Sequence, residues 1–302
     1  MYLEHFGLNE WPFGITPDTS FFFSSRSSQQ ALNTVLVAAR SGEGFIKITG
    51  EVGSGKTLLC RLLLLTVGEG FVTAYLPNPT LTPPGLLLEL AAELGLGTSR
   101  LRTLPPARQT PQLLKKLNER LLHLAAQGDR VLLCLDEVQA MSVETLETLR
   151  LLTNLETEKR KLLQVVIFGQ PELDEKLAHP SVRQLRQRIT FDYRLEPLSG
   201  IELGRYLQHR LQVAGGGSAR FTASALWLLK WRSRGYPRLV NVAAHKALMA
   251  AFGRDTRTVG LREMWAAVTD TAALRWQMPR LTWTWLGMLA VGLMALGLMR
   301  VG

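Results

Sequence analysis

The chain has 302 residues, 46% of them hydrophobic, which is enough for one large domain or two modest domains with real cores. Its two cysteines lie in apolar runs and exclude a disulfide framework or a zinc site, which suits a reducing compartment. The formal net charge of +10 is spread along the chain without a long basic run, so nucleic acid, an anionic membrane face and a generally basic surface all stay open as explanations.

Up to Pro197, helical periodicity alternates with short apolar runs, which predicts an α/β fold. We expect strands at residues 45–49, 71–76, 131–135, 163–168 and 190–193. We expect helices at residues 29–39, 58–65, 86–94, 112–126 and 143–155. The third and fourth strands are almost wholly apolar, as in a parallel sheet that is covered on both faces.

After Pro197 only helical patterns remain. They cover residues 200–213, 223–231, 239–252 and 261–274, with a Gly-Gly-Gly-Ser loop at 215–218. The sequence therefore predicts a sheet-containing domain at 1–197, followed by a small all-helical domain at 198–277.

Residues 281–299 contain no charged side chain and are long enough to cross the hydrocarbon core of a bilayer. Two tryptophans lie near the start of this segment and two arginines precede it: Trp283, Trp285, Arg275 and Arg280. This pattern predicts one transmembrane helix at 281–300, with the larger domains on the cytoplasmic side of the inner membrane. A buried helix is the alternative, but a core helix of this length normally has a polar stripe. The N-terminus lacks the pattern of a signal peptide.

A complete P-loop pattern, G-x-x-x-x-G-K-[ST], lies between the first expected strand and the helix that follows it. Its glycines let backbone N–H groups point at phosphate oxygens, Lys56 reaches the β and γ phosphates, and the Thr57 hydroxyl ligates Mg²⁺. The pattern predicts that ATP and Mg²⁺ bind at Gly50, Glu51, Val52, Gly53, Ser54, Gly55, Lys56, Thr57 and Leu58.

Two acids, Asp136 and Glu137, end the apolar strand at 131–135. In P-loop enzymes an aspartate at this place holds the Mg²⁺ water shell, so we assign Asp136 to the metal together with Thr57. Glu137 is placed to polarise the attacking water, and its presence favours hydrolysis over nucleotide sensing. The alternative is a pair of solvated acids at the end of a strand.

Three further positions are candidates for catalysis. Gln170 follows the strand at 163–168, where a polar side chain can touch the γ-phosphate and the water, although a simple turn residue is the alternative. One arginine among Arg183, Arg186 and Arg188 could act on the ATP of a neighbouring subunit, and a basic helix face is the alternative. Arg238, at the start of a helix in the second domain, could reach the phosphates or lie on the surface.

Taken together, these motifs resemble the AAA+ ATPases of the general secretion pathway protein A family, which also includes the MSHA biogenesis protein MshM. The resemblance covers roughly residues 1–275 and includes ITPD at 15–18, GEVGSGKT at 50–57, LDEVQAM at 135–141, FGQPEL at 168–173 and GYPRLVN at 235–241. It implies a P-loop AAA+ (ASCE) parallel-sheet core with a small helical lid, ATP hydrolysis, and ring-like homo-oligomers, possibly hexamers.

The resemblance also assigns roles to residues. It implies that Gln170 is sensor 1, Arg238 is sensor 2, and Arg186 or Arg188 is the arginine finger. It implies that residues 15–18 line the adenine pocket. Members from type II secretion continue beyond the membrane segment into a periplasmic peptidoglycan-binding domain. This sequence stops three residues after Met299, so peptidoglycan binding is not carried over.

Three functions compete. The first is a membrane-anchored ATPase that drives assembly or remodelling of an envelope secretion or type IV pilus-like system through an unknown partner. The second is a DNA-directed AAA+ ATPase that resembles transposition or replication-initiator ATPases; the net charge of +10 favours it, and the lack of a helix-turn-helix pattern after the second domain speaks against it. The third is a non-hydrolysing nucleotide switch or scaffold, which the acid pair Asp136-Glu137 argues against.

Overall fold

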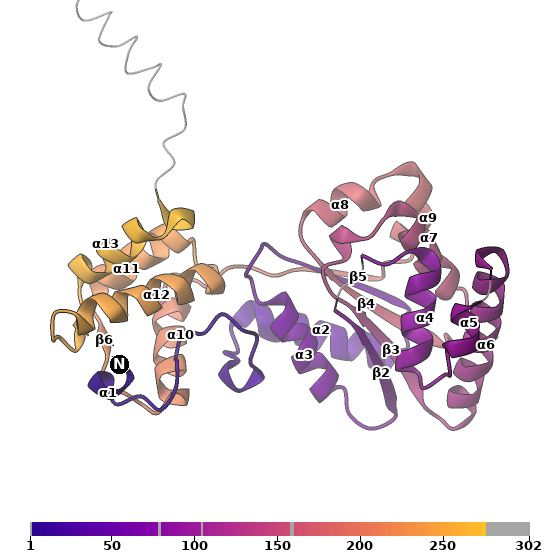
Figure 1. The fold of residues 1–302 in the computed structure, drawn as a ribbon, viewed down its shortest axis with the longest axis horizontal. Coiled ribbons are helices and arrows are strands. Elements are labelled where there is room, and N and C mark those ends of the chain that lie inside the picture. The colour runs from indigo at the N-terminus through magenta and orange to yellow at the C-terminus, as the bar shows by residue number, and fades with distance from the viewer. Residues whose placement is uncertain (1, 78–79, 104, 158–159, 276–302) are drawn as a thin grey trace, which may run out of the picture.

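The protein forms two domains joined by extended segments in a computed structural model that describes residues 2–77, 80–103, 105–157 and 160–275 (Figure 1). The larger domain is built on a five-stranded sheet, and the smaller one is a bundle of helices. The chain crosses from the larger to the smaller domain between Arg194, which ends the last strand of the sheet, and Gly200, which begins the first helix of the bundle.

The sheet is entirely parallel and has the strand order β2-β3-β4-β1-β5. Its strands are β1 (Phe45–Thr49), β2 (Phe71–Leu76), β3 (Arg130–Leu135), β4 (Leu163–Gly169) and β5 (Phe191–Arg194). β1 and β4 are fully buried, as their apolar sequences require of central strands. Since all strands are parallel, the segments that follow β1, β3 and β4 leave the sheet at one edge.

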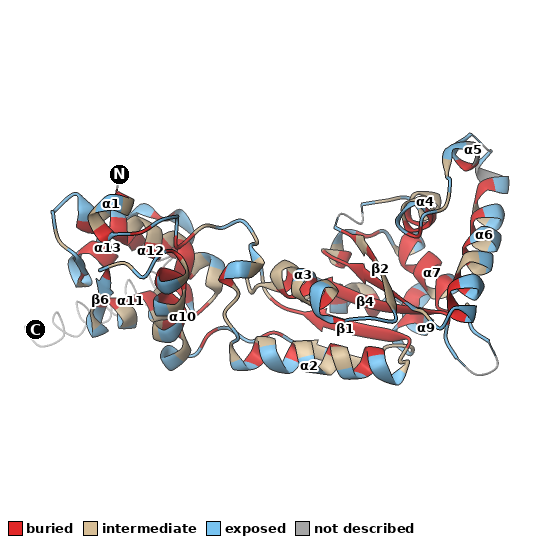
Figure 2. Cartoon of the chain, turned by 90° about the horizontal axis from the view of Figure 1, so that it is seen from below, coloured by how far each residue is buried: buried red, intermediate tan, exposed pale blue. Residues whose placement is uncertain are grey.

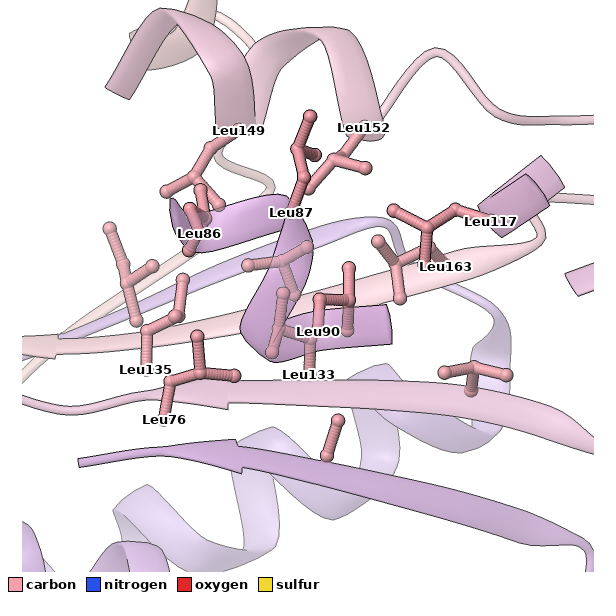
Figure 3. Packing of buried hydrophobic residues seen from close by; sticks show 14 of the residues in the cluster. Leu76, Leu86, Leu87, Leu90, Leu117, Leu133, Leu135, Leu149, Leu152 and Leu163 are labelled. Atoms are coloured by element: carbon pink, nitrogen blue, oxygen red, sulfur yellow. The ribbon is translucent and has the colours of Figure 1, made fainter. Parts of the chain in front are cut away.

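Helices cover both faces of the sheet (Figure 2). On one face lie α2 (Arg26–Ser41) and α3 (Lys56–Thr66), which pack on Ile46, Ile48 and Phe168. The other face is covered by α4 (Pro83–Glu93), α5 (Ser99–Arg102), α6 (Pro106–Ala126), α7 (Val143–Leu152), α8 (Glu172–Leu177) and α9 (Arg183–Arg186). Leucines dominate this second core, where α4 inserts Leu86, Leu87 and Leu90 between the sheet and α7 (Figure 3).

Three helices of the core were not predicted, and several others begin before their predicted starts. The sequence missed α5, α8 and α9 because these helices are only four to six residues long and too short to show a helical period. α3 begins at Lys56 rather than at 58, and α6 begins at Pro106, six residues before the predicted start. Short 3-10 turns, η2 (Val138–Ala140) and η3 (Pro180–Val182), follow β3 and α8.

The second domain contains α10 (Gly200–Val213), α11 (Ala223–Ser233), α12 (Pro237–Phe252), α13 (Leu261–Asp270) and the 3-10 turn η4 (Ala272–Leu274). The prediction that it is all-helical is wrong in one detail. The strands β6 (Arg220–Phe221) and β7 (Thr258–Val259) form a small parallel ladder. Two residues per strand are too few to show an alternating pattern, so no sequence pattern predicts these strands.

The N-terminal segment packs with the second domain, although we placed it with the first. Its short helix α1 (Tyr2–Phe6) and turn η1 (Thr19–Phe21) bury apolar side chains in the core of the helical bundle. The contributing residues are Tyr2, Phe6, Leu8, Phe13 and Phe21. The domain boundaries at 197 and 277 stay predictions, but this packing shows that the bundle combines the N-terminal segment with helices that begin at Gly200 (Figure 1).

Within the part of the chain that the structure describes, no helix is both long and apolar enough to cross a bilayer. The predicted transmembrane helix at 281–300 lies outside the described residues.

Candidate nucleotide-binding site

The P-loop forms a tight turn between β1 and α3, as its sequence predicts. Gly53 and Gly55 have φ angles of 76° and 100°, a left-handed conformation that glycine adopts with no steric cost. The amide of Gly50 donates to the carbonyl of Gly169 over 3.1 Å, which ties the loop to the end of β4. Ser54 Oγ is buried and has no hydrogen-bond partner among the described residues.

Lys56 lies inside this turn and is only 4% exposed. Its ammonium group donates to the backbone carbonyls of Gly50 and Glu51 over 2.8 and 3.1 Å. Burial lowers the pKa of Lys56, while the nearby carboxylates of Glu137 and Asp136 act in the opposite direction. A buried cation without a close ion-pair partner is suited to bind an anion at this position.

Thr57 and Asp136 are 79 positions apart and meet at the edge of the sheet. Thr57 Oγ1 donates to Asp136 Oδ2 over 2.5 Å, and the Glu137 amide donates to Asp136 Oδ1 over 2.9 Å. Burial raises the pKa of Asp136, although these two hydrogen bonds act the other way. A hydroxyl and a carboxylate in contact beside the P-loop are the oxygen ligands that Mg²⁺ prefers. Their contact places both predicted metal residues at one point.

Glu137 begins a turn that directs its side chain into the site. Its φ of 54° is rare for a residue with a side chain and marks a constrained position. Glu137 Oε2 accepts hydrogen bonds from Gln170 Nε2 over 3.0 Å and from Gln139 Nε2 over 2.5 Å. Burial would raise the pKa of Glu137, but these bonds and the charge of Lys56 outweigh burial and lower it. Glu137 is therefore a charged acceptor at neutral pH.

Gln139 is a member of the site that we did not predict. It donates to Glu137 and its Oε1 accepts the backbone N–H of Gln170 over 3.0 Å, so it joins the ends of β3 and β4. Lys176 on α8 donates to the carbonyls of Gln139 and Met141, and these two hydrogen bonds hold the turn after β3 in place. The only signal in the sequence was the position of Gln139, two residues after Glu137.

The three candidate finger arginines have different surroundings. Arg183 and Arg186 are exposed, and their side chains make no hydrogen bond or ion pair with the residues that the structure describes. Arg188 is half-buried and donates to the side chains of Thr153 and Asn154 after α7. Arg188 is thus held within its own subunit, whereas Arg183 and Arg186 project from the surface.

Arg238 lies where the helical domain contacts the P-loop. Its backbone N–H donates to the carbonyl of Gly53 over 3.1 Å. A Cβ atom added to Gly53 would lie 2.3 Å from the Cβ of Arg238, so the contact is too close for any other residue at position 53. The Leu198 amide donates to the carbonyl of Gly235 over 3.0 Å and holds the same turn from the interdomain segment.

A cleft of about 340 Å³ separates the P-loop from the helical domain. It is lined by Gly53, Lys56, Thr57 and Glu137 on one side and by Arg238 and Asn241 on the other. Residues 14–18, which include the segment predicted to line an adenine pocket, form a third wall. Gln170 and Asp136 do not line this cleft; they lie behind Glu137 and Thr57.

A buried polar network in the helical domain holds this third wall. Asn241 Nδ2 and Arg210 Nη2 donate to the carbonyl of Gly14 over 3.1 and 3.3 Å, and Tyr206 joins both side chains. Arg210 is 6% exposed, and its guanidinium lies 4.7 Å from the ring centre of Phe21. From the first domain, Arg61 donates to the carbonyl of Pro17 over 2.7 Å. No sequence pattern predicts the contacts with residues 14–18, because they join residues that are 44 to 227 positions apart.

Comparison with known proteins agrees with this geometry. Residues 39–177 match the family described as "AAA domain". This region is an AAA domain. The chain is also 40% identical, over 275 residues, to the general secretion pathway protein A of Aeromonas hydrophila, and the alignment covers 91% of this chain and 49% of that protein. The predicted resemblance to general secretion pathway protein A is confirmed, and the chain spans about half the length of that relative.

Solved structures show the same fold at low sequence identity. The ORC2 protein of Aeropyrum pernix, in ADPNP–ADP complexes, has a TM-score of 0.60 at 19% identity, with 86% of this chain and 73% of that chain covered. The RuvB Holliday junction branch migration motor of Thermotoga maritima has a TM-score of 0.55 at 15% identity, with 85% and 73% covered. These likenesses establish an α/β AAA+ P-loop fold and nothing finer.

The residues present fit a nucleoside triphosphate with Mg²⁺. The buried Lys56 ammonium lines the P-loop end of the cleft, the unpartnered Ser54 hydroxyl lies in the same loop, and the Thr57–Asp136 pair offers the metal ligands. A base would lie beyond, between residues 14–18 and α12. The assignment of individual roles stays a prediction.

Proposed function

We propose that this protein is a membrane-anchored AAA+ ATPase that hydrolyses ATP to drive assembly or remodelling of an envelope secretion or type IV pilus-like system. The hydrogen bonds that Gln170 and Gln139 donate to Glu137, beside the Thr57–Asp136 pair, carry this proposal. A charged and oriented carboxylate next to a Mg²⁺-ligand pair is what hydrolysis requires and simple nucleotide binding does not.

In this mechanism each residue has one task. Lys56 and the P-loop amides bind the β and γ phosphates. Thr57 and Asp136 would hold Mg²⁺, which would supply positive charge beside these phosphates. Glu137 accepts a proton from the attacking water, and its orientation depends on Gln139 and Gln170. Arg238 approaches the phosphates from the helical domain, because its backbone is already bound to Gly53.

The catalytic unit in this proposal is an oligomer. Arg186 is exposed and without a partner among the described residues, so it is free to reach the ATP of a neighbouring subunit. Arg188 is engaged by Thr153 and Asn154, so we assign it a structural role and assign the finger to Arg186. A ring of such subunits would turn over ATP only when assembled.

The membrane and secretion parts of the proposal rest on two observations. The charge-free run at 281–299 would place the AAA domain at the cytoplasmic face of the inner membrane. The relative from Aeromonas hydrophila is named for the general secretion pathway. Its activity and partners are proposals for this chain, which spans 49% of that protein.

The decisive experiment measures the ATPase rate of the detergent-solubilised full chain against protein concentration. We expect the rate per molecule to rise with concentration and to vanish in Lys56→Ala. We expect Glu137→Gln to retain nucleotide binding and to lose turnover by a factor of about 100 or more. Arg186→Ala should lose turnover without losing stability, and Arg188→Ala should unfold at lower temperature. A negligible rate at every concentration, with nucleotide bound, would support a switch and contradict the motor.

A DNA-directed ATPase is the second candidate, and the net charge of +10 favours it. The ORC1 protein of Aeropyrum pernix, solved in complex with DNA, shares the fold with a TM-score of 0.62 at 19% identity, with 86% of this chain and 68% of that chain covered. Duplex DNA binding by the full chain that falls steeply with salt, together with ATPase stimulation by DNA, would favour this candidate over the first.

A further inference from the structure

A second hollow, of about 520 Å³, lies on the helical domain away from the nucleotide cleft. Three arginines and two aromatic residues line it: Arg232, Arg234, Arg275, Trp231 and Tyr236. No acidic side chain lines it among the residues that the structure describes. The nearest acid in sequence, Asp270, is paired with Lys246 over 2.7 Å. The hollow is therefore a positively charged site with aromatic walls.

An exposed tryptophan pair adjoins this hollow. Trp227 and Trp231 lie one helical turn apart on α11, and their rings stack with centres 5.7 Å apart. They are 65% and 51% exposed, although α11 buries Leu228 and Leu229 on its other side. Tryptophan next to arginine is the combination that favours the headgroup region of a bilayer, where the ring is half-buried and the cation meets phosphate.

The hollow lies close in sequence to the predicted membrane segment. Arg275 lines it and is the last residue that the structure describes, and the predicted membrane segment begins at residue 281. Six residue steps span at most about 20 Å, so a chain anchored at 281 keeps the hollow within that distance of the bilayer. Juxtamembrane arginines within a Debye length of anionic lipid are attracted to it.

The hollow and the nucleotide cleft lie at the two ends of one turn. Arg234 and Tyr236 line the hollow, and Pro237 and Arg238 line the cleft. The turn is tightly held, since Gly235 has a φ of 87° and a Cβ atom added to it would lie 2.3 Å from the carbonyl oxygen of Leu198. A ligand that orders Arg234 and Tyr236 would therefore act on the contact between Arg238 and Gly53.

We propose that this hollow binds the phosphate headgroups of anionic lipids in the membrane that anchors the chain, and that this binding strengthens the contact of Arg238 with the P-loop. The inference rests on the proposed membrane anchor. It assigns the helical domain a role as a membrane-facing lid, so that ATP turnover depends on the lipid at the site of assembly.

The test uses the full chain in nanodiscs of phosphatidylcholine alone or with about 30% phosphatidylglycerol, which gives the bilayer a negative surface potential. A fluorophore on Ala273→Cys reports on the hollow, and one on Val37→Cys on α2 serves as the control; the native cysteines, Cys60 and Cys134, are buried. Lipids with a nitroxide on the headgroup quench a fluorophore that contacts the surface. ATPase rates are measured in the same discs.

We expect phosphatidylglycerol to increase quenching at position 273 and to leave position 37 unchanged. Turnover should rise by about fivefold, which is the factor in an equilibrium constant that corresponds to the attraction of one arginine to an anionic membrane surface. The double variant Arg234→Asn, Arg275→Gln should lose both responses. The control double variant Arg205→Gln, Arg257→Gln removes the same charge from exposed sites outside the hollow and should keep both.

The outcomes separate this inference from the proposed function. If the chain enters the discs and hydrolyses ATP, but quenching and turnover are the same in both lipid mixtures, the hollow is not a lipid site and the proposed ATPase stands. The same conclusion holds if the two double variants respond equally to phosphatidylglycerol. A chain that does not insert overturns the anchor and the inference together. Relief of the quenching by duplex DNA, but not by soluble phosphate, would assign the hollow to nucleic acid instead.

Discussion

The two walls of the nucleotide cleft are built in different ways. The P-loop wall takes its residues from the segments that follow β1, β3 and β4, and each residue lies within eight positions of the end of its strand. The facing wall comes from Gly14–Asp18, α10 and α12, which belong to one bundle although they are up to 227 positions apart. In the function that we propose, the first wall carries the chemistry, and the second decides how closely the cleft can close.

The largest effect should come from the point where the two walls touch. Gly53→Ala introduces a Cβ atom 2.3 Å from the Cβ of Arg238 at a φ of 76°, so the domains must separate. We expect ATP turnover to fall about 100-fold, since displacement of a positioning group by about 1 Å costs this much. Single-turnover ATP hydrolysis measures the change.

Gly128→Ala is the matched control for this variant. Gly128 also has a positive φ, of 93°, but its Cβ would meet no atom within 4 Å. It should lose about 1 kcal/mol of stability and no activity. Equal loss of turnover in both variants would mean that strain in the backbone, and not the interdomain contact, explains the effect.

Within the P-loop wall, Gln139→Ala should lower kcat by about 10-fold with little change in KM. The variant removes a donor to Glu137 and the acceptor of the Gln170 amide, so the carboxylate loses its orientation while the phosphate-binding residues stay in place. Steady-state kinetics of Gln139→Ala and Gln170→Ala measures the effects on kcat and KM separately. A rise in KM with unchanged kcat would show that Gln139 serves binding instead.

Within the facing wall, Arg210→Met should lower the free energy of unfolding by about 3 kcal/mol and weaken nucleotide binding. It leaves the carbonyl of Pro12 without its donor and removes one of the two donors to the carbonyl of Gly14, and an unsatisfied buried group costs about 1–3 kcal/mol. Urea unfolding and nucleotide titration measure the two effects. Arg205→Met, on the exposed side of α10, should change stability by no more than about 0.5 kcal/mol.

The smallest expected effect depends on pH and concerns the interdomain segment. Glu202 caps α10 and accepts the amides of Ser199 and Arg26, and these bonds outweigh burial and lower its pKa. Since the folded-state pKa lies below the unfolded one, this stabilisation is present above the unfolded pKa and is lost as the pH falls through the folded pKa. Glu202→Gln should therefore cost about 1 kcal/mol at pH 7 and progressively less below about pH 4.

Thermal unfolding of the wild type and of Glu202→Gln between pH 3 and pH 7 checks this prediction. A difference between wild type and Glu202→Gln that stays constant over this range would show that the carboxylate charge contributes nothing.

The P-loop wall could be predicted because its signals are local. A strand, a turn with two required glycines and a lysine-threonine pair occupy thirteen consecutive positions, from Phe45 to Thr57. Asp136, Glu137 and Gln170 each end an apolar run, and parallel strands bring such ends to one edge. The sequence alone therefore placed the phosphate end of the site and the family of the fold.

Only the tertiary structure decided the rest. That Arg188 is held by Thr153 and Asn154 while Arg186 is exposed depends on the packing of α7 against α9, which no periodicity reveals. The burial of Arg210, the β6–β7 ladder and the packing of the N-terminal segment with the helical bundle all join residues distant in sequence. Local patterns report on backbone geometry and on which face is apolar, whereas these features depend on which apolar faces meet.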